Sequence, residues 1–186
     1  HPPPLLLPTF PADARRIATF VEPAHAVGLE FEEGLVETIL ADVNHQPGAL
    51  PLLQFALTEL FERRDGRWLT LQAYRDIGGV SGALARRADE LYGTLDETGQ
   101  KTARQMFLRL VTLNEGAEDT RRRVRLDELL SLQGDGQVMQ KVVDLFGKYR
   151  LLTFDCDPAT RTPTVEVAHE ALIRQWQLLR GWLQKD

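Results

Sequence analysis

The stretch of sequence that decides the fold of this chain lies near its end and reads Thr164-Val165-Glu166-Val167-Ala168-His169-Glu170-Ala171-Leu172-Ile173-Arg174-Gln175-Trp176. Polar and apolar residues alternate over 164–167, which is the period of two of a β-strand. Helical spacing follows, because one apolar stripe continues through Leu172, Trp176, Leu179 and Leu183. His169 and Glu170 stand where the strand feeds the helix. Such a pair either contacts a bound anion or caps the helix, and the residues leave both open.

The bulk composition indicates a folded globular protein. The chain has 186 residues, of which 43% are hydrophobic and 26% are charged, and disordered chains are poorer in apolar residues. No apolar run is long enough to cross a bilayer, so we expect no membrane contact. Cys156 is the single cysteine, which excludes a disulfide framework and makes the cytoplasm the expected location. Because the chain begins at His1 without a methionine, we interpret it as a piece of a longer protein.

Charge is divided unevenly along the chain. Residues 1–96 carry 8 basic and 14 acidic residues, a net charge of −6, whereas residues 97–186 carry 14 and 13, a net charge of +1. Neither part has the strongly basic balance of a nucleic-acid-binding domain, which disfavours nucleic acid as a partner. The one dense basic run covers 121–125. It would form either a phosphate-binding face or, as we favour, a strand edge paired with nearby acids.

The first half of the chain predicts a helical bundle. Residues 1–12 are a proline-rich linker by composition. Helical spacing predicts helices over 13–22, 31–43, 50–64, 69–77 and 83–95, with no strand pattern between them. Pro51 falls in the first turn of its helix, and Thr70 is a candidate N-cap. The glycine-rich segment 78–82 is expected to be a hinge between helices. We therefore predict an all-helical domain over 13–96.

The second half predicts a winged-helix domain over 97–186. The expected order is a helix over 96–113, a strand over 120–125, helices over 126–132 and 138–149, a strand over 151–154, a hairpin loop, a strand over 164–168 and one last helix to about residue 184. The predicted fold class is therefore mainly α, a helical bundle followed by a winged-helix domain with a small β-hairpin. The helix over 138–149 would hold the DNA-reading position, but it offers only Lys141 and Lys148 against Asp144.

Searches for catalytic motifs find no complete constellation in the sequence. There is no P-loop motif and no nucleophile elbow. His169-Glu170 does not begin a zinc-protease motif, because Ile173 stands where the second histidine would be needed. The four histidines show no metal-ligand spacing. We therefore predict neither catalytic nor metal-binding residues, and no catalysis by this chain alone.

Short motifs along residues 20–185 occur in one order: Pro23-Ala24, Gly34-Leu35-Val36, Gln46-Pro47-Gly48-Ala49-Leu50-Pro51-Leu52-Leu53, Leu57-Thr58-Glu59-Leu60, Ile77-Gly78-Gly79-Val80, Gly82-Ala83-Leu84-Ala85, Arg121-Arg122, Arg150-Leu151-Leu152-Thr153, and Val167-Ala168-His169-Glu170-Ala171-Leu172-Ile173-Arg174 with Trp176 and Trp182. Together they resemble the segment that follows the ATPase core of bacterial STAND NTPases. These are signal-transducing P-loop ATPases of the NACHT/AP-ATPase type, and many also carry WD repeats.

The resemblance implies a lid domain and a winged-helix domain that both touch a nucleotide. In that family a Gly-x-Pro turn of the lid contacts the adenine side, which implies nucleotide contacts for Gly48 (or Ala49), Leu50 and Pro51. The histidine of a Met-His-Asp motif contacts the β-phosphate of ADP and holds the resting state. Ala168-His169-Glu170 stands at that position, with Ala in place of Met and Glu in place of Asp. ADP or ATP with Mg²⁺ would bind only in the full-length protein, because the P-loop is absent from these residues.

The favoured hypothesis is a regulatory fragment of a STAND signalling ATPase. It would act as a nucleotide switch that couples nucleotide state to autoinhibition and homo-oligomerisation. Its partner would be the P-loop ATPase core of the same chain. Two alternatives stay open on the residues alone: a DNA-binding transcription regulator with a winged helix, and a protein-interaction scaffold built on the helical bundle.

Overall fold

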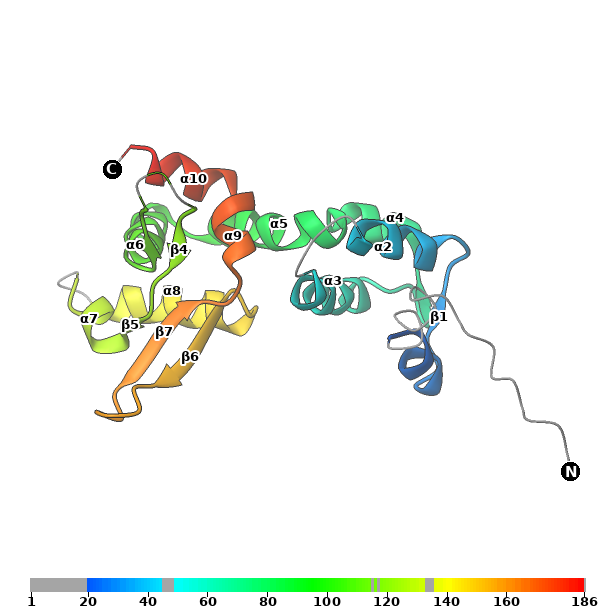
Figure 1. The fold of residues 1–186 in the computed structure, drawn as a ribbon, viewed down its shortest axis with the longest axis horizontal. Helices are drawn as coiled ribbons and strands as arrows, with labels where there is room; N and C mark the ends of the chain where they lie inside the picture. Colours follow the sequence, from blue (N-terminus) through cyan, green and yellow to red (C-terminus); the bar gives the residue numbers. More distant parts are fainter. Residues whose placement is uncertain (1–19, 45–48, 115, 117, 133–135, 186) are drawn as a thin grey trace, which may run out of the picture. The chain divides into compact units, whose positions relative to one another are not determined.

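The computed structural model describes residues 20–44, 49–114, 116, 118–132 and 136–185, and the chain divides into two compact units at Val80 and Ser81 (Figure 1). The described chain is mainly helical with small sheets, which confirms the mainly α fold class. The linker predicted over 1–12 lies outside the described residues. The domain division predicted at residue 97 stays a prediction.

The first unit contains helices and one short parallel strand pair. Residues 20–26 are helical, and the other elements are β1 (Glu30–Phe31), α2 (Leu35–Asn44), α3 (Leu50–Glu62), β2 (Trp68–Leu69) and α4 (Leu71–Asp76). Thr70 caps α4, because its hydroxyl accepts the Ala73 N–H at 3.1 Å. The parallel pairing of β1 with β2 corrects the prediction of an all-helical domain. A strand of two residues is too short to show a period of two.

A buried tyrosine holds the end of the first unit together. Tyr74 of α4 is 3% exposed, and its hydroxyl donates to the Asp42 carboxylate at 2.5 Å and accepts the Val80 N–H at 3.2 Å. Gly78 and Gly79 lie where the chain turns into α5 (Gly79–Thr94), with φ of +88° and +68°, a backbone that favours glycine. A Cβ on Gly79 would also lie 3.0 Å from the Asp42 carboxylate. Residues 78 and 79 therefore turn the chain as predicted, whereas Gly82 lies inside α5.

The second unit continues from α5 through helices and two further sheets. Its elements are α6 (Glu97–Arg109), β3 (Val111–Thr112), β4 (Thr120–Arg121), β5 (Val124–Arg125), α7 (Leu126–Leu130), α8 (Gly136–Lys148), β6 (Leu152–Cys156), β7 (Pro163–Val167), α9 (Glu170–Gln175) and α10 (Gln177–Leu183). β3 pairs with β4, and the antiparallel three-stranded sheet has the order β5-β7-β6. The strand predicted over 120–125 is therefore two strands in two sheets.

The two strands of the β6–β7 hairpin run side by side in Figure 1, and α8 packs against β6. Val165 and Val167 of β7 are buried and the intervening Glu166 is half-buried, so the alternation over 165–167 distinguishes the inner and outer faces of a strand. Thr164 is buried although it is polar. Phe154 of β6 covers α8 so closely that a Cβ on Gly147 would lie 2.6 Å from its ring. Glycine at 147 therefore lets the hairpin approach the helix.

The last helical segment is broken, which corrects the prediction of one continuous helix to residue 184. α9 ends and α10 begins at Trp176, whose backbone is extended at φ −80° and ψ 105°. Trp176 is fully buried, and its indole N–H donates to the Asp89 carboxylate of α5 at 2.7 Å. Its ring packs on Phe107 and Trp182 at centroid distances of 5.0 and 5.3 Å. No glycine or proline marks the break, and tertiary packing fixes this backbone conformation.

A buried hydroxyl in β7 provides a stability prediction. Thr164 is 5% exposed, and its Oγ1 has no hydrogen-bond partner within the described part of the chain. Thr164→Val is expected to raise the free energy of unfolding by about 1 kcal/mol, since it removes an unsatisfied buried polar group of nearly the same shape. Urea unfolding followed by circular dichroism measures the change. Thr102→Val is the matched control, because the Thr102 hydroxyl donates to the Thr98 carbonyl at 2.8 Å, and stabilisation of both variants alike would contradict the prediction.

Candidate functional site

His169 lies at the corner where β7 passes into α9. The Ala168 N–H donates to the Leu151 carbonyl at 2.9 Å, and the His169 carbonyl accepts the Leu172 N–H at 3.0 Å. His169 is therefore the N-cap residue of α9 with an extended backbone, yet its side chain makes no capping hydrogen bond. The sequence left two roles open for His169, contact with a bound anion and capping of the helix. The His169 side chain does not cap α9.

The surroundings of His169 favour a neutral imidazole. Burial of the half-buried ring lowers its pKa, and the positive charge of Arg121 lowers the same pKa further. Arg121 belongs to β4, and its guanidinium donates to the Ala168 carbonyl at 3.4 Å. A neutral imidazole has one N–H donor and one acceptor nitrogen. Beside the guanidinium, this corner can therefore offer a hydrogen bond and a positive charge to an anion.

The proximity of Arg121 to His169 was not predicted, although its basic run was noted. Arg123 of the same run is paired at 3.2 Å with Glu166 and at 3.4 Å with Asp155. Arg125 forms an ion pair with Asp127, which holds the pKa of the Asp127 carboxyl below its usual value. The favoured interpretation of a strand edge paired with acids is therefore confirmed for these two arginines.

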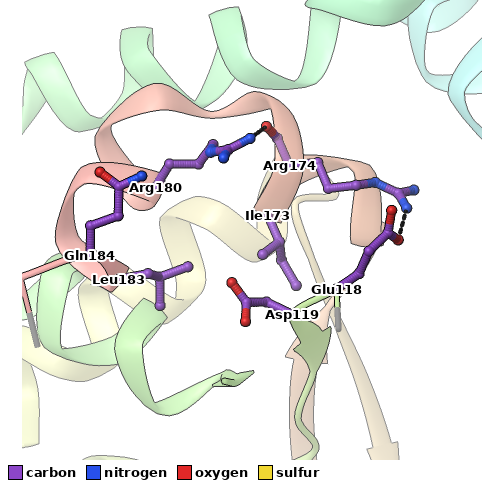
Figure 2. Close-up of a pocket in the computed structure, with 7 residues that line it drawn as sticks. All are labelled: Glu118, Asp119, Ile173, Arg174, Arg180, Leu183 and Gln184. Carbon is purple, nitrogen blue, oxygen red and sulfur yellow. Dashed lines mark hydrogen bonds and ion pairs between the residues drawn. The ribbon is translucent and has the colours of Figure 1, made fainter. Parts of the chain in front are cut away.

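A cavity of about 320 Å³ lies along α9 and α10, on the helices that follow His169. Figure 2 shows the Arg174 guanidinium turned toward the Glu118 carboxylate, which lies 2.8 Å away. Arg180 reaches the Arg174 carbonyl at 3.3 Å. Asp119 also lines the cavity, and its carboxylate accepts the Asn114 N–H at 3.2 Å. These polar groups satisfy one another within the unit, so we assign no ligand to this cavity.

The other predicted site residues lie at the start of α3. Leu50 is 62% exposed and Pro51 is exposed beside it, in the first turn where a proline needs no N–H partner. Ala49 precedes them without a side-chain cap. The two side chains therefore offer a small apolar surface that can pack against a flat ring. Gly48 lies outside the described residues, and each predicted site is described only within its own unit.

In residues 20–44, 49–114, 116, 118–132 and 136–185, no three His, Cys, Asp or Glu residues gather where they could hold a metal ion. The same residues contain no helix that is long and apolar enough to span a bilayer.

The lowered pKa of His169 predicts a pH dependence of stability. Because the pKa is lower in the folded chain, the unfolded chain binds a proton first as the pH falls below its ordinary value of 6.5. Stability from the neutral imidazole is therefore complete above that pH and declines until the pH passes the folded pKa. His169→Asn is expected to flatten the fall of the melting temperature between about pH 7.5 and 5. Parallel curves of melting temperature against pH for His169→Asn and the wild type would contradict the assignment. His25→Asn is the control, because it removes an imidazole from the first unit.

Comparison with known proteins gives one match that spans nearly the whole chain. A family model described as novel STAND NTPase 1 matches residues 5–186. No curated protein and no solved structure matches the chain.

Proposed function

Because the chain belongs to the novel STAND NTPase 1 family, we propose that it is the lid and winged-helix regulatory part of a STAND ATPase. It acts in the cytoplasm on the P-loop ATPase core of the same chain and carries no catalysis of its own. It couples nucleotide state to autoinhibition and homo-oligomerisation. The NACHT/AP-ATPase type, a bacterial source and accompanying WD repeats are the finer parts of this proposal.

The order of elements in the second unit supports the winged-helix part of the proposal. A winged helix combines a helix, a short strand, two helices and a β-hairpin in this order. α6, β5, α7, α8, β6 and β7 follow it, and β7 lies between β5 and β6 in the sheet. α8 would be the DNA-reading helix, but its basic residues are only Lys141 and Lys148, and Asp144 between them accepts the Gln140 amide N–H at 2.7 Å. Protein contact within the same chain is therefore the role we propose for this domain.

Residues of each unit, taken by itself, support the proposed nucleotide contacts, and the magnesium is proposed to lie in another part of the protein. His169 and Arg121 supply a hydrogen-bond donor and a cation for a phosphate. Leu50 and Pro51 supply an exposed apolar surface for the adenine. The phosphates of bound ADP would supply the negative charge that Arg121 and the His169 N–H contact. The acids of the described residues form no metal cluster, so Mg²⁺ would be held by the ATPase core.

The single observation that carries the proposal is that the His169 imidazole lies near the Arg121 guanidinium and does not cap α9. His169 is oriented by backbone hydrogen bonds on both sides of the corner and does not cap α9. Burial keeps it neutral, so it can donate to a phosphate oxygen without bringing a second cation beside Arg121. A hydrogen bond to a charged group contributes about 1.5–3 kcal/mol. Loss of that contact would favour the open state by roughly 10- to 100-fold.

The experiment that tests the proposal follows oligomerisation of the full-length protein. His169→Ala is expected to raise the oligomeric fraction in ADP, as measured by light scattering, because the resting state loses its phosphate contact. His169→Gln keeps an N–H donor and is expected to recover part of the resting state. His25→Ala is the control for a histidine of the first unit. An unchanged oligomeric state and unchanged ADP retention in His169→Ala would overturn the proposal.

A further inference from the structure

We propose that a groove along α6 is the docking surface for an acidic amphipathic helix of a partner protein. Two cavities of about 490 and 350 Å³ adjoin at Leu108. We call them together the α6 groove, and beyond Leu108 it is lined mainly by Val111, Leu113, Leu132, Arg109 and Arg122. Figure 1 shows α10 and α7 on opposite sides of α6 in this unit. Leu183 of α10 belongs to one cavity and Leu132, just after α7, to the other.

The floor of the α6 groove is apolar and partly open to solvent. Leu113 is 52% exposed at one end of the groove. Leu108 is half-buried between the two cavities. Contiguous apolar surface of this kind marks interaction sites more often than isolated exposed residues do. The lining runs from 105 to 113, roughly 17 Å of helix and strand, which matches about three turns of a docked helix.

The charges beside the groove indicate which helix would dock there. Arg109 and Arg122 are exposed, and neither guanidinium makes an ion pair or hydrogen bond with another residue that the structure describes. Arg123 and Arg174 of the same unit are each paired with a carboxylate. The residues that line the two cavities include no acid. An apolar stripe flanked by glutamates or aspartates would therefore complement this groove in both shape and charge.

Two other occupants are less well matched. Nucleic acid would meet only two unpaired arginines and would cover exposed leucines with phosphate, which supplies no apolar surface in return. A second copy of this chain would place arginines against arginines if the groove packed on itself across a twofold axis. An acidic amphipathic helix is therefore the occupant that the apolar lining and the two arginines favour together.

The test measures peptide binding to the 186-residue chain by fluorescence anisotropy. The probe is a fluorescein-labelled helical peptide of about 14 residues, with leucines on one stripe and glutamates beside it, and the control peptide has lysines in place of the glutamates. The glutamate peptide is expected to bind at least about tenfold more tightly than the lysine peptide. Arg109→Glu combined with Arg122→Glu is expected to reverse that preference, and Leu113→Asp is expected to weaken both peptides.

A matched variant controls for net charge. Arg150→Glu combined with Arg161→Glu changes charge equally at two exposed arginines that do not line the α6 groove, and it should keep the wild-type preference. Equal binding of both peptides, or equal effects of the two charge-reversed variants, would overturn the proposal. Dimerisation that disappears in Leu113→Asp would overturn it in favour of a second copy. Salt-dependent binding of duplex DNA that is lost in the Arg109 and Arg122 variant would overturn it in favour of nucleic acid.

Discussion

Replacement of Trp176 by alanine is expected to lower the free energy of unfolding of the second unit by about 4 kcal/mol. The side chain is fully buried, so its removal loses apolar burial and leaves a cavity. Its ring packs on Phe107 and Trp182, and the indole N–H bond to Asp89 ties the α9–α10 break to α5. Urea unfolding followed by far-ultraviolet circular dichroism measures the loss without relying on the removed fluorophore.

Trp182→Ala is the matched control for Trp176. Trp182 contacts the same cluster through Trp176 and Tyr92, but its side chain is only half-buried. Its removal is therefore expected to cost about 2 kcal/mol. Equal losses in the two variants would show that Trp176 does not have the central packing role assigned to it.

Tyr74→Phe is expected to destabilise the first unit by about 3 kcal/mol. The variant removes one hydroxyl that donates to the Asp42 carboxylate and accepts the Val80 N–H. The Val80 N–H lies in a residue that is 1% exposed, so it would stay buried without an acceptor. Burial and Asp42 raise the pKa of Tyr74 far above neutral pH, so the hydroxyl keeps its proton throughout the measurement.

Tyr92→Phe controls for the loss of a tyrosine hydroxyl. Tyr92 contacts Trp176 and Trp182 through its ring, and no hydrogen bond of its hydroxyl occurs among the described residues. The free energy of unfolding of Tyr92→Phe is expected to differ from that of the wild type by less than about 0.5 kcal/mol. Hydrogen exchange at the Val80 amide separates the two cases, since only Tyr74→Phe should speed it. Unchanged exchange there would contradict the proposed role of the tyrosine.

Helix positions could be predicted from local signals because those signals act within one or two turns. The Thr70 cap, the apolar stripe through Leu172 and the strand alternation at Val165 and Val167 all depend on neighbours close in sequence. Asp96 likewise accepts the Gly99 N–H at 2.7 Å at the start of α6. The two-residue strands β1, β2 and β3 were not predicted, because two residues are too few to show a period of two. Their pairing is decided by partners distant in sequence, as where Glu30 pairs with Trp68 and Phe31 with Leu69.

Features that depend on tertiary packing could not be predicted from sequence patterns. The apolar stripe continues unbroken past Trp176, so only the contacts of its ring and its bond to Asp89, 87 positions away, explain the break. The site shows the same limit. His169 was identified by its place in the chain, whereas Arg121 lies 47 residues from the Ala168 carbonyl that it contacts. Leu50 lies on the predicted apolar spacing of its helix, yet it is exposed because it stands in the first turn.

The central claim is that His169 helps to hold ADP in the resting state, and ADP dissociation tests it most directly. The measurement is the release rate of a fluorescent ADP analogue from the full-length protein after addition of excess unlabelled ADP. His169→Ala is expected to release the analogue about 10- to 100-fold faster than the wild type, and His25→Ala is expected to release it at the wild-type rate. Identical release rates for His169→Ala and the wild type would contradict the account.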